Sequence, residues 1–195
     1  LNGNWSTLPR GPANTTMPVS GDVAIFSFSG TTVRLRSNVN LGAAGGLVMS
    51  SAWTGSILQG TGTLRIGTTG WRVGSGTFVG GNTSAFINNA GSFTMTGGIV
   101  RSQQATTNMS GSLSILSSSN TRPSFSATGT LVFSGNATQT FTIGQNRVTA
   151  VIQNLTLNNS AAAGSNHLYS SGSGMSLSGT LPISQGVLNL TKSST

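Results

Sequence analysis

The segment most informative about the fold is Gly62-Thr63-Leu64-Arg65-Ile66, in which a glycine precedes alternating polar and apolar residues. Alternation with a period of two, begun by a glycine that permits a tight turn, is typical of a half-buried β-strand. A glycine followed by Ser or Thr and a large apolar residue occurs six times, beginning at Gly62, Gly76, Gly91, Gly111, Gly129 and Gly179. The first five copies follow one another at short and unequal intervals. We interpret this irregular period as successive coils of β-structure with loop insertions of different length.

Composition supports an all-β protein. The chain has 195 residues, a length expected of one domain with a substantial core. Only 5% of the residues are charged, where about 25% is usual, so the polar surface must consist of Ser, Thr, Asn and Gln. These residues favour turns and strands, and the helix formers Glu and Lys are nearly absent. We therefore expect essentially no helix and, because no cysteine is present, no disulfide or thiolate metal site.

Short alternating segments predict roughly eighteen strands in total. Many are three or four residues long, shorter than the strands of β-sandwiches, and suit a coil whose rungs stack about 4.8 Å apart. We predict a right-handed parallel β-solenoid (β-helix) over residues 23–195, with tandem β-sandwiches as the alternative. Residues 1–22, which contain three prolines, are predicted to form an N-terminal cap or lead-in segment. The clearest predicted strands are residues 23–28, 32–35, 63–66, 71–73, 77–79, 92–95, 113–116, 130–133, 140–143, 151–157 and 187–190.

Both ends of the chain resemble one known family. Residues 129–160, beginning Gly-Thr-Leu-Val-Phe-Ser-Gly and ending Asn-Leu-Thr-Leu-Asn-Asn-Ser, are similar to repeats of large secreted surface proteins of Bacteroidetes. Residues 177–189 match the segment that follows in those repeats. Residues 3–6 and 17–25 resemble the opening of the same proteins, and the matched pieces keep the order found in the family.

The resemblance implies a surface-exposed or released β-helical protein of the adhesin type, exported through the type IX pathway. We therefore expect an extracellular or cell-surface location. Members of that family usually carry a C-terminal sorting domain, which this sequence does not show, and are commonly longer and more acidic. We expect either that the chain is part of a longer protein or that it is a short relative with another role.

Few residues in the chain could perform catalysis. Paired carboxylates for glycoside cleavage are excluded, because Asp22 is the only acidic residue. A Ser-His-Asp triad would join Asp22 to His167, which we expect to lie roughly seven coils away. We expect Asp22 to cap the turn before the first strand and His167 to have a structural role in a loop. The sequence thus predicts no enzyme.

Cofactor and metal sites are also not expected. A β-roll that binds calcium needs an Asp in every rung, and one acidic residue cannot supply them. The glycine clusters complete neither a G-x-G-x-x-G motif nor a P-loop. The sequence contains no apolar run of the length that a membrane-spanning helix needs, so we expect no transmembrane helix.

The net charge of +8 raises the question of an anionic partner. The nine basic residues are spread over the whole length, without the cluster and interleaved aromatic residues that nucleic-acid binding needs. We predict no nucleic-acid partner. A solenoid can bring distant residues into one stripe, and Arg65 with Arg72, on neighbouring predicted strands, is the pair we consider for a weak anionic-glycan face, against scattered solvated arginines as the alternative.

The tryptophans give a second glycan hypothesis. Trp53 and Trp71 could stack on sugar rings beside polar Asn and Gln side chains. The structural alternative is favoured: Trp71 fills the core or rim, and Trp5 plugs the open end of the coil. A lattice of threonines for ice binding is suggested by Thr94-Met95-Thr96 and Thr140-Phe141-Thr142, but these segments do not recur in register along the sequence.

Two function hypotheses follow. The first is a non-enzymatic adhesin-type module that attaches to surfaces or polysaccharides. The second is a self-assembling structural subunit of an extracellular filament or sheath, because uncharged faces and uncovered coil ends lack the usual defences against edge-to-edge pairing.

Overall fold

The computed structural model describes residues 20–28, 30, 32–117, 120–144, 148–161, 167–171 and 175–190, with the backbone alone for 167–171 and 189–190. Every regular element in these ranges is a β-strand. The strands are β1 (Val23–Phe26), β2 (Thr32–Leu35), β3 (Val39–Asn40), β4 (Gly46–Met49), β5 (Ser56–Gln59), β6 (Thr63–Ile66), β7 (Gly70–Val73), β8 (Thr77–Val79), β9 (Phe86–Asn89), β10 (Phe93–Met95), β11 (Ile99–Gln103), β12 (Thr106–Met109), β13 (Leu113–Ile115), β14 (Ser124–Phe133), β15 (Gln139–Ile143), β16 (Thr149–Asn158), β17 (His167–Ser171), β18 (Met175–Leu177), β19 (Ile183–Gln185) and β20 (Val187–Leu190).

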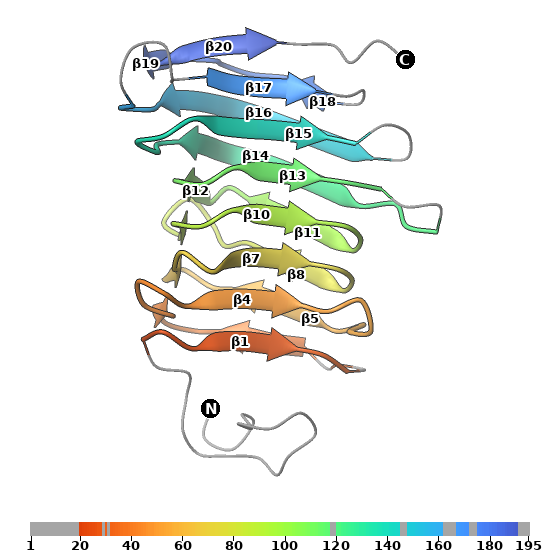
Figure 1. The fold of residues 1–195 in the computed structure, drawn as a ribbon. Coiled ribbons are helices and arrows are strands. Elements are labelled where there is room, and N and C mark those ends of the chain that lie inside the picture. Colours follow the sequence, from red (N-terminus) through yellow and green to blue (C-terminus); the bar gives the residue numbers. More distant parts are fainter. Residues whose placement is uncertain are drawn as a thin grey trace.

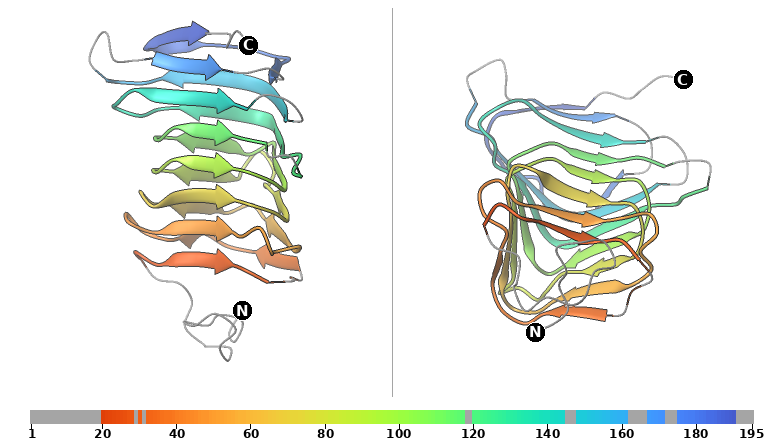
Figure 2. Two further views of the ribbon diagram at one scale, coloured as in Figure 1. Left: turned by 45° about the vertical axis from the view of Figure 1, so that its right-hand side comes forward. Right: turned by 60° about the horizontal axis from the view of Figure 1, so that its bottom comes forward.

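The strands stack into three faces around one core (Figures 1 and 2). Face one is the eight-stranded sheet β1-β4-β7-β10-β13-β15-β17-β20. Face two contains β2, β5, β8, β11, the first halves of β14 and β16, and β18. Face three contains β3, β6, β9, β12, the second halves of β14 and β16, and β19. The chain therefore passes through faces one, two and three in each rung.

The solenoid is parallel and right-handed. Each described strand pairing is parallel, for example β4 with β7 and β5 with β8. In Figure 1 the near strands of face one run to the right and the far strands run to the left while the chain climbs, which is a right-handed coil. The predicted solenoid is confirmed, and the alternative of tandem β-sandwiches is wrong, since sandwich sheets are antiparallel.

Inward-facing side chains stack in columns that fill the core. Along face one, Leu47, Trp71 and Phe93 occupy successive rungs in register, and each is at most 4% exposed. Alternate residues point outward, as in β10, where half-buried Thr94 lies between buried neighbours. Apolar burial is the main favourable contribution to folding. These columns of buried apolar side chains therefore form a continuous core along the solenoid.

The length of one rung differs from the sequence-based interpretation. The glycine motif precedes strands on all three faces: β6 on face three, β8 on face two and β10 on face one. It marks corners, so the interval between two copies does not measure one coil. Rung length is given instead by the positions that stack on face one, which are Ala24, Leu47, Trp71, Phe93 and Leu113 in this part of the chain.

Two devices form the corners. Before face two, Gly76 and Gly98 have φ angles of +76° and +75°, a left-handed conformation that glycine adopts without a steric penalty. Between faces two and three, the buried Gln59 side chain donates from Nε2 to the carbonyls of Gly62 and Phe86, both at 2.9 Å. The backbone carbonyls of Gly62 and Phe86 at this bend therefore accept hydrogen bonds from a side chain, in addition to the hydrogen bonds between strands.

The first strand begins at Val23. Residues 1–19 of the predicted cap lie outside the described residues, so a cap over residues 1–22 stays a prediction. Within the described ranges there is no helix of the length and apolarity required to span a membrane.

Candidate functional site

The two tryptophans considered as sugar contacts lie in the core. Trp53 is 3% exposed and packs against Phe26, with ring centroids 5.1 Å apart. Trp71 is 1% exposed and makes edge contacts with Phe78 and Phe93, at 4.7 and 4.9 Å. A ring without an exposed face cannot stack on a sugar, so the glycan role of both residues is corrected to core packing. Trp5 lies outside the described residues.

Arg65 and Arg72 do not share a face. Arg65 points outward from β6 on face three, in register with Asn88, whereas Arg72 points outward from β7 on face one, in register with Thr94. A corner of the solenoid separates the two strands. The predicted anionic-glycan pair is therefore corrected: the structure distributes these two charges over two surfaces.

A different pair of arginines shares one outward column. On face two, Arg34 is in register with Leu58, then Val79, then Arg101. Three strand steps correspond to about 14 Å between the two arginines. Both arginines are exposed, and the side chains between them are half-buried. Sequence reasoning missed this pair because the two positions are far apart along the chain and rung length was not known.

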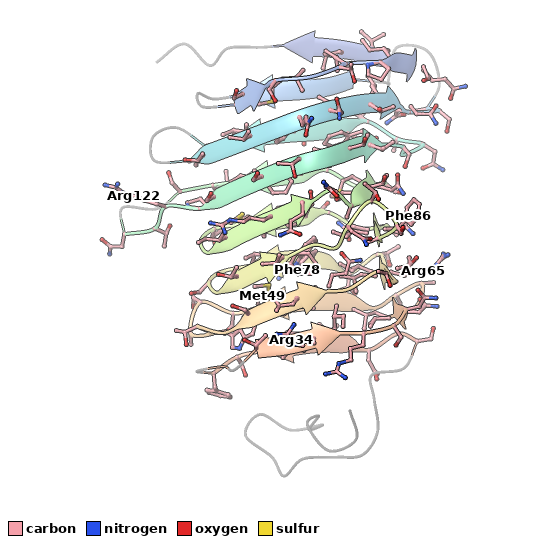
Figure 3. The ribbon with its side chains drawn as sticks, turned by 180° about the vertical axis from the view of Figure 1, so that it is seen from behind. Arg34, Met49, Arg65, Phe78, Phe86 and Arg122 are labelled. Atoms are coloured by element: carbon pink, nitrogen blue, oxygen red, sulfur yellow. The ribbon has the colours of Figure 1, made fainter. Side chains whose placement is uncertain are left out.

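A hollow lies beside Arg34. Its volume is about 290 Å³, and it is bounded by residues of β2 and β5 and of the corner that follows each strand. Arg36, also exposed, lies two residues beyond Arg34 at that corner. Figure 3 looks onto face two, with Arg34 on the surface toward the viewer and Arg65 and Arg122 toward opposite sides. The lining residues are Arg34, Leu35, Arg36, Leu58, Gln59 and Gly60.

Neutral polar side chains also form outward columns. On face one, Thr94, Ser114 and Thr142 are in register on three successive strands. One threonine of each segment considered for ice binding, Thr94 and Thr142, thus lies in a shared column, which the sequence alone did not reveal. Arg72 occupies the next position of that column, so the hydroxyl series is interrupted by a charge.

On face three, the polar column forms its own hydrogen bond. Nδ2 of Asn108 donates to Oδ1 of Asn88 on the neighbouring strand at 2.7 Å. Both asparagines are half-buried and point away from the core. The outer surface thus repeats hydrogen-bonding groups at the spacing of the rungs, about 4.8 Å.

The residues considered for catalysis remain far apart. Asp22 precedes β1, and its carbonyl oxygen accepts a hydrogen bond from the amide of Gly46. His167 begins β17 of the same face, six strand steps away, or about 29 Å. The described residues contain no group of three or more His, Cys, Asp or Glu side chains that could hold a metal ion.

Comparison with known proteins gives no relative. No protein-family model, no curated protein and no solved structure matches the chain.

Proposed function

We propose that the chain is a non-enzymatic, extracellular attachment module that binds polysaccharide, a role of the adhesin type. The observation that carries the proposal is the outer surface: in-register columns of hydroxyl and amide groups repeat at the rung spacing, as in Thr94-Ser114-Thr142 and Asn88-Asn108. A polymer that repeats its own hydroxyl groups can pair with several rungs at once, and such multivalent contact raises affinity without any deep pocket.

The resemblance of residues 129–160 and 177–189 to secreted surface proteins supports the extracellular location and the attachment role. A long, right-handed solenoid is also a suitable scaffold, because each rung adds binding surface while contacting only its neighbours.

The test is a binding panel. Purified chain is incubated with immobilised neutral and acidic polysaccharides, and bound protein is measured after washing. We expect saturable binding to at least one polymer, and soluble oligosaccharides of that polymer should compete with it for the protein. Failure to bind any polysaccharide would contradict it.

A self-assembling structural subunit is the second candidate, and it is favoured by exposed apolar residues near both ends of the described solenoid. Val23 and Ile25 on β1 are 39% and 59% exposed, and Ile183 and Val187 near the other end are 49% and 50% exposed. Burying such residues between stacked copies would be favourable. Electron microscopy distinguishes the candidates: ordered filaments support the subunit, and isolated rods exclude it.

A further inference from the structure

We propose that face two binds an acidic polysaccharide, with Arg34, Arg36 and Arg101 pairing with its carboxylate or sulfate groups. The inference rests on the proposed attachment function and names the ligand class and the face that binds it. It replaces the pair that the sequence suggested, Arg65 and Arg72, by Arg34 and Arg101, which the register brings onto one surface, with Arg36 at the adjoining corner.

The sequence has far more basic than acidic residues, so arginine side chains remain to bind an anionic ligand. The sequence has nine Lys and Arg residues and a single acidic residue, Asp22. Because Asp22 is the single acidic side chain, most of the nine basic side chains have no carboxylate side chain of this sequence to pair with. Arg34, Arg36 and Arg101 are all exposed. A planar guanidinium donates two parallel hydrogen bonds to a carboxylate or sulfate group, which makes exposed arginine the suitable side chain for such ligands.

The arginines are spaced for a chain-like ligand rather than for a single small anion. Arg34 and Arg101 lie in one outward column with two rungs between them, about 14 Å apart. One carboxylate cannot reach both arginines. A polymer that lies along the solenoid axis and carries acidic groups on successive sugars can reach both, and the hollow between Arg34 and Arg36 receives one of those groups.

The positions between the arginines suit sugar rings. Leu58 and Val79 fill the column, and both are half-buried, so they present a shallow apolar strip to the C–H face of a pyranose. Two residues earlier on each strand, Thr32, Ser56 and Thr77 form a parallel column of hydroxyl groups in register. Apolar contact beside hydrogen-bonding groups is typical of ligand sites that fix orientation.

These columns favour polysaccharide over nucleic acid. Single-stranded nucleic acid is held by aromatic side chains on which bases stack. The outward column from Arg34 to Arg101 and the hydroxyl column of Thr32, Ser56 and Thr77 contain no aromatic ring among their described residues. The surface therefore offers charge, hydroxyl groups and aliphatic contact without a stacking platform.

The experiment compares two double variants of equal net charge. Arg34→Gln with Arg101→Gln removes the two charges of the outward column on face two and leaves Arg36, and Arg65→Gln with Arg72→Gln removes one charge each from faces three and one. All four residues are exposed, so both variants should fold, which circular dichroism and thermal unfolding verify. Affinities are measured for polygalacturonate, dextran sulfate, neutral dextran and a single-stranded oligonucleotide.

We expect the intact protein to bind polygalacturonate or dextran sulfate, the two polymers distinguishing carboxylate from sulfate. The face-two variant should lose about tenfold or more in affinity, as expected when charge-assisted hydrogen bonds are removed, while the Arg65/Arg72 variant changes less than about threefold. Equal losses in both variants would overturn the inference, because net charge alone would then explain binding.

Two further outcomes separate the inference from the proposed function. Binding to neutral dextran alone, unaffected by either variant, would overturn the acidic ligand and leave the attachment function standing. Stronger binding to the oligonucleotide than to either acidic polymer would also overturn the inference. Failure to bind any polysaccharide in this set and in the wider panel would overturn both proposals.

Discussion

The side chains of Asn159 and Gln139 are joined inside the protein: Nδ2 of Asn159 donates to Oε1 of Gln139 at 2.7 Å, and both residues are 1% exposed. Oε1 of Gln139 also accepts from the amide of Gly135 at 3.0 Å, and its Nε2 donates to the carbonyls of Met109 and Gly111 at 2.8 and 2.9 Å. This network closes the corner between faces three and one across consecutive rungs.

Replacing Gln139 should therefore destabilise the solenoid. Gln139→Leu keeps a similar volume but leaves buried groups of Asn159, Gly135, Met109 and Gly111 without these partners, and each unsatisfied group costs about 1–3 kcal/mol. We expect the free energy of unfolding to fall by roughly 3 kcal/mol or more. Urea unfolding followed by circular dichroism measures it, with Asn108→Ala on the outer surface as the control. A change no larger than that of the control would contradict the role of the network.

Trp71 should contribute to stability and not to ligand binding. Its indole nitrogen is buried without a hydrogen-bond partner, so Trp71→Phe removes volume but no hydrogen bond. We expect a loss of about 1–2 kcal/mol in the free energy of unfolding, as for a partial core truncation, and unchanged affinity for polysaccharide. Thermal unfolding and the binding panel on the same variant check both parts. A selective loss of affinity with stability retained would reinstate the sugar-stacking role.

Gly76 should not tolerate a side chain. Its φ of +76° disfavours any L-residue by about 1–2 kcal/mol, and a Cβ there would lie 2.6 Å from the Trp53 ring and 2.9 Å from the carbonyl oxygen of Gly55. Gly76→Ala should lower the free energy of unfolding by about 2 kcal/mol or more. The adjacent Ser75→Ala serves as the control in chemical denaturation. Equal stability of the two variants would show that this corner does not require glycine.

Binding through arginine should weaken with salt. Ionic strength screens interactions between exposed charges, with a Debye length of about 8 Å at 0.15 M and about 3 Å at 1 M. We expect the affinity for an acidic polysaccharide to fall by at least about tenfold between these concentrations. Calorimetric titration at several NaCl concentrations provides the measurement, with sucrose at matched osmolality as the control. Affinity independent of salt would exclude an ionic contact.

The sequence predicted the fold class well because local alternation is a strong signal. The predicted strands 32–35, 63–66, 77–79 and 187–190 have the bounds found in β2, β6, β8 and β20. The strands β9 and β12 were not predicted individually, because their inward positions include buried Asn89 and Thr107, which break the apolar pattern. Buried polar residues of this kind are recognised only when their partners in other rungs are known.

The surface was less predictable than the core. Whether two arginines share a face depends on the number of residues in each corner. The alternation of polar and apolar residues along a strand does not indicate that number. Arg65 and Arg72 are close in sequence and lie on different faces, while Arg34 and Arg101 are far apart in sequence and lie in one column. The favoured interpretation of Trp71 as a core or rim residue agrees with its burial, and in β7 its side chain lies on the opposite side of the strand from exposed Arg72.

The most direct test of polysaccharide attachment through face two is a backbone amide NMR titration of the isotope-labelled protein with an acidic oligosaccharide such as oligogalacturonate. The structure predicts chemical-shift changes concentrated in β2, β5, β8 and β11, around Arg34 and Arg101, with the facing strands of face one unchanged. Changes confined to face one or face three, or no saturable change at all, would exclude attachment through face two.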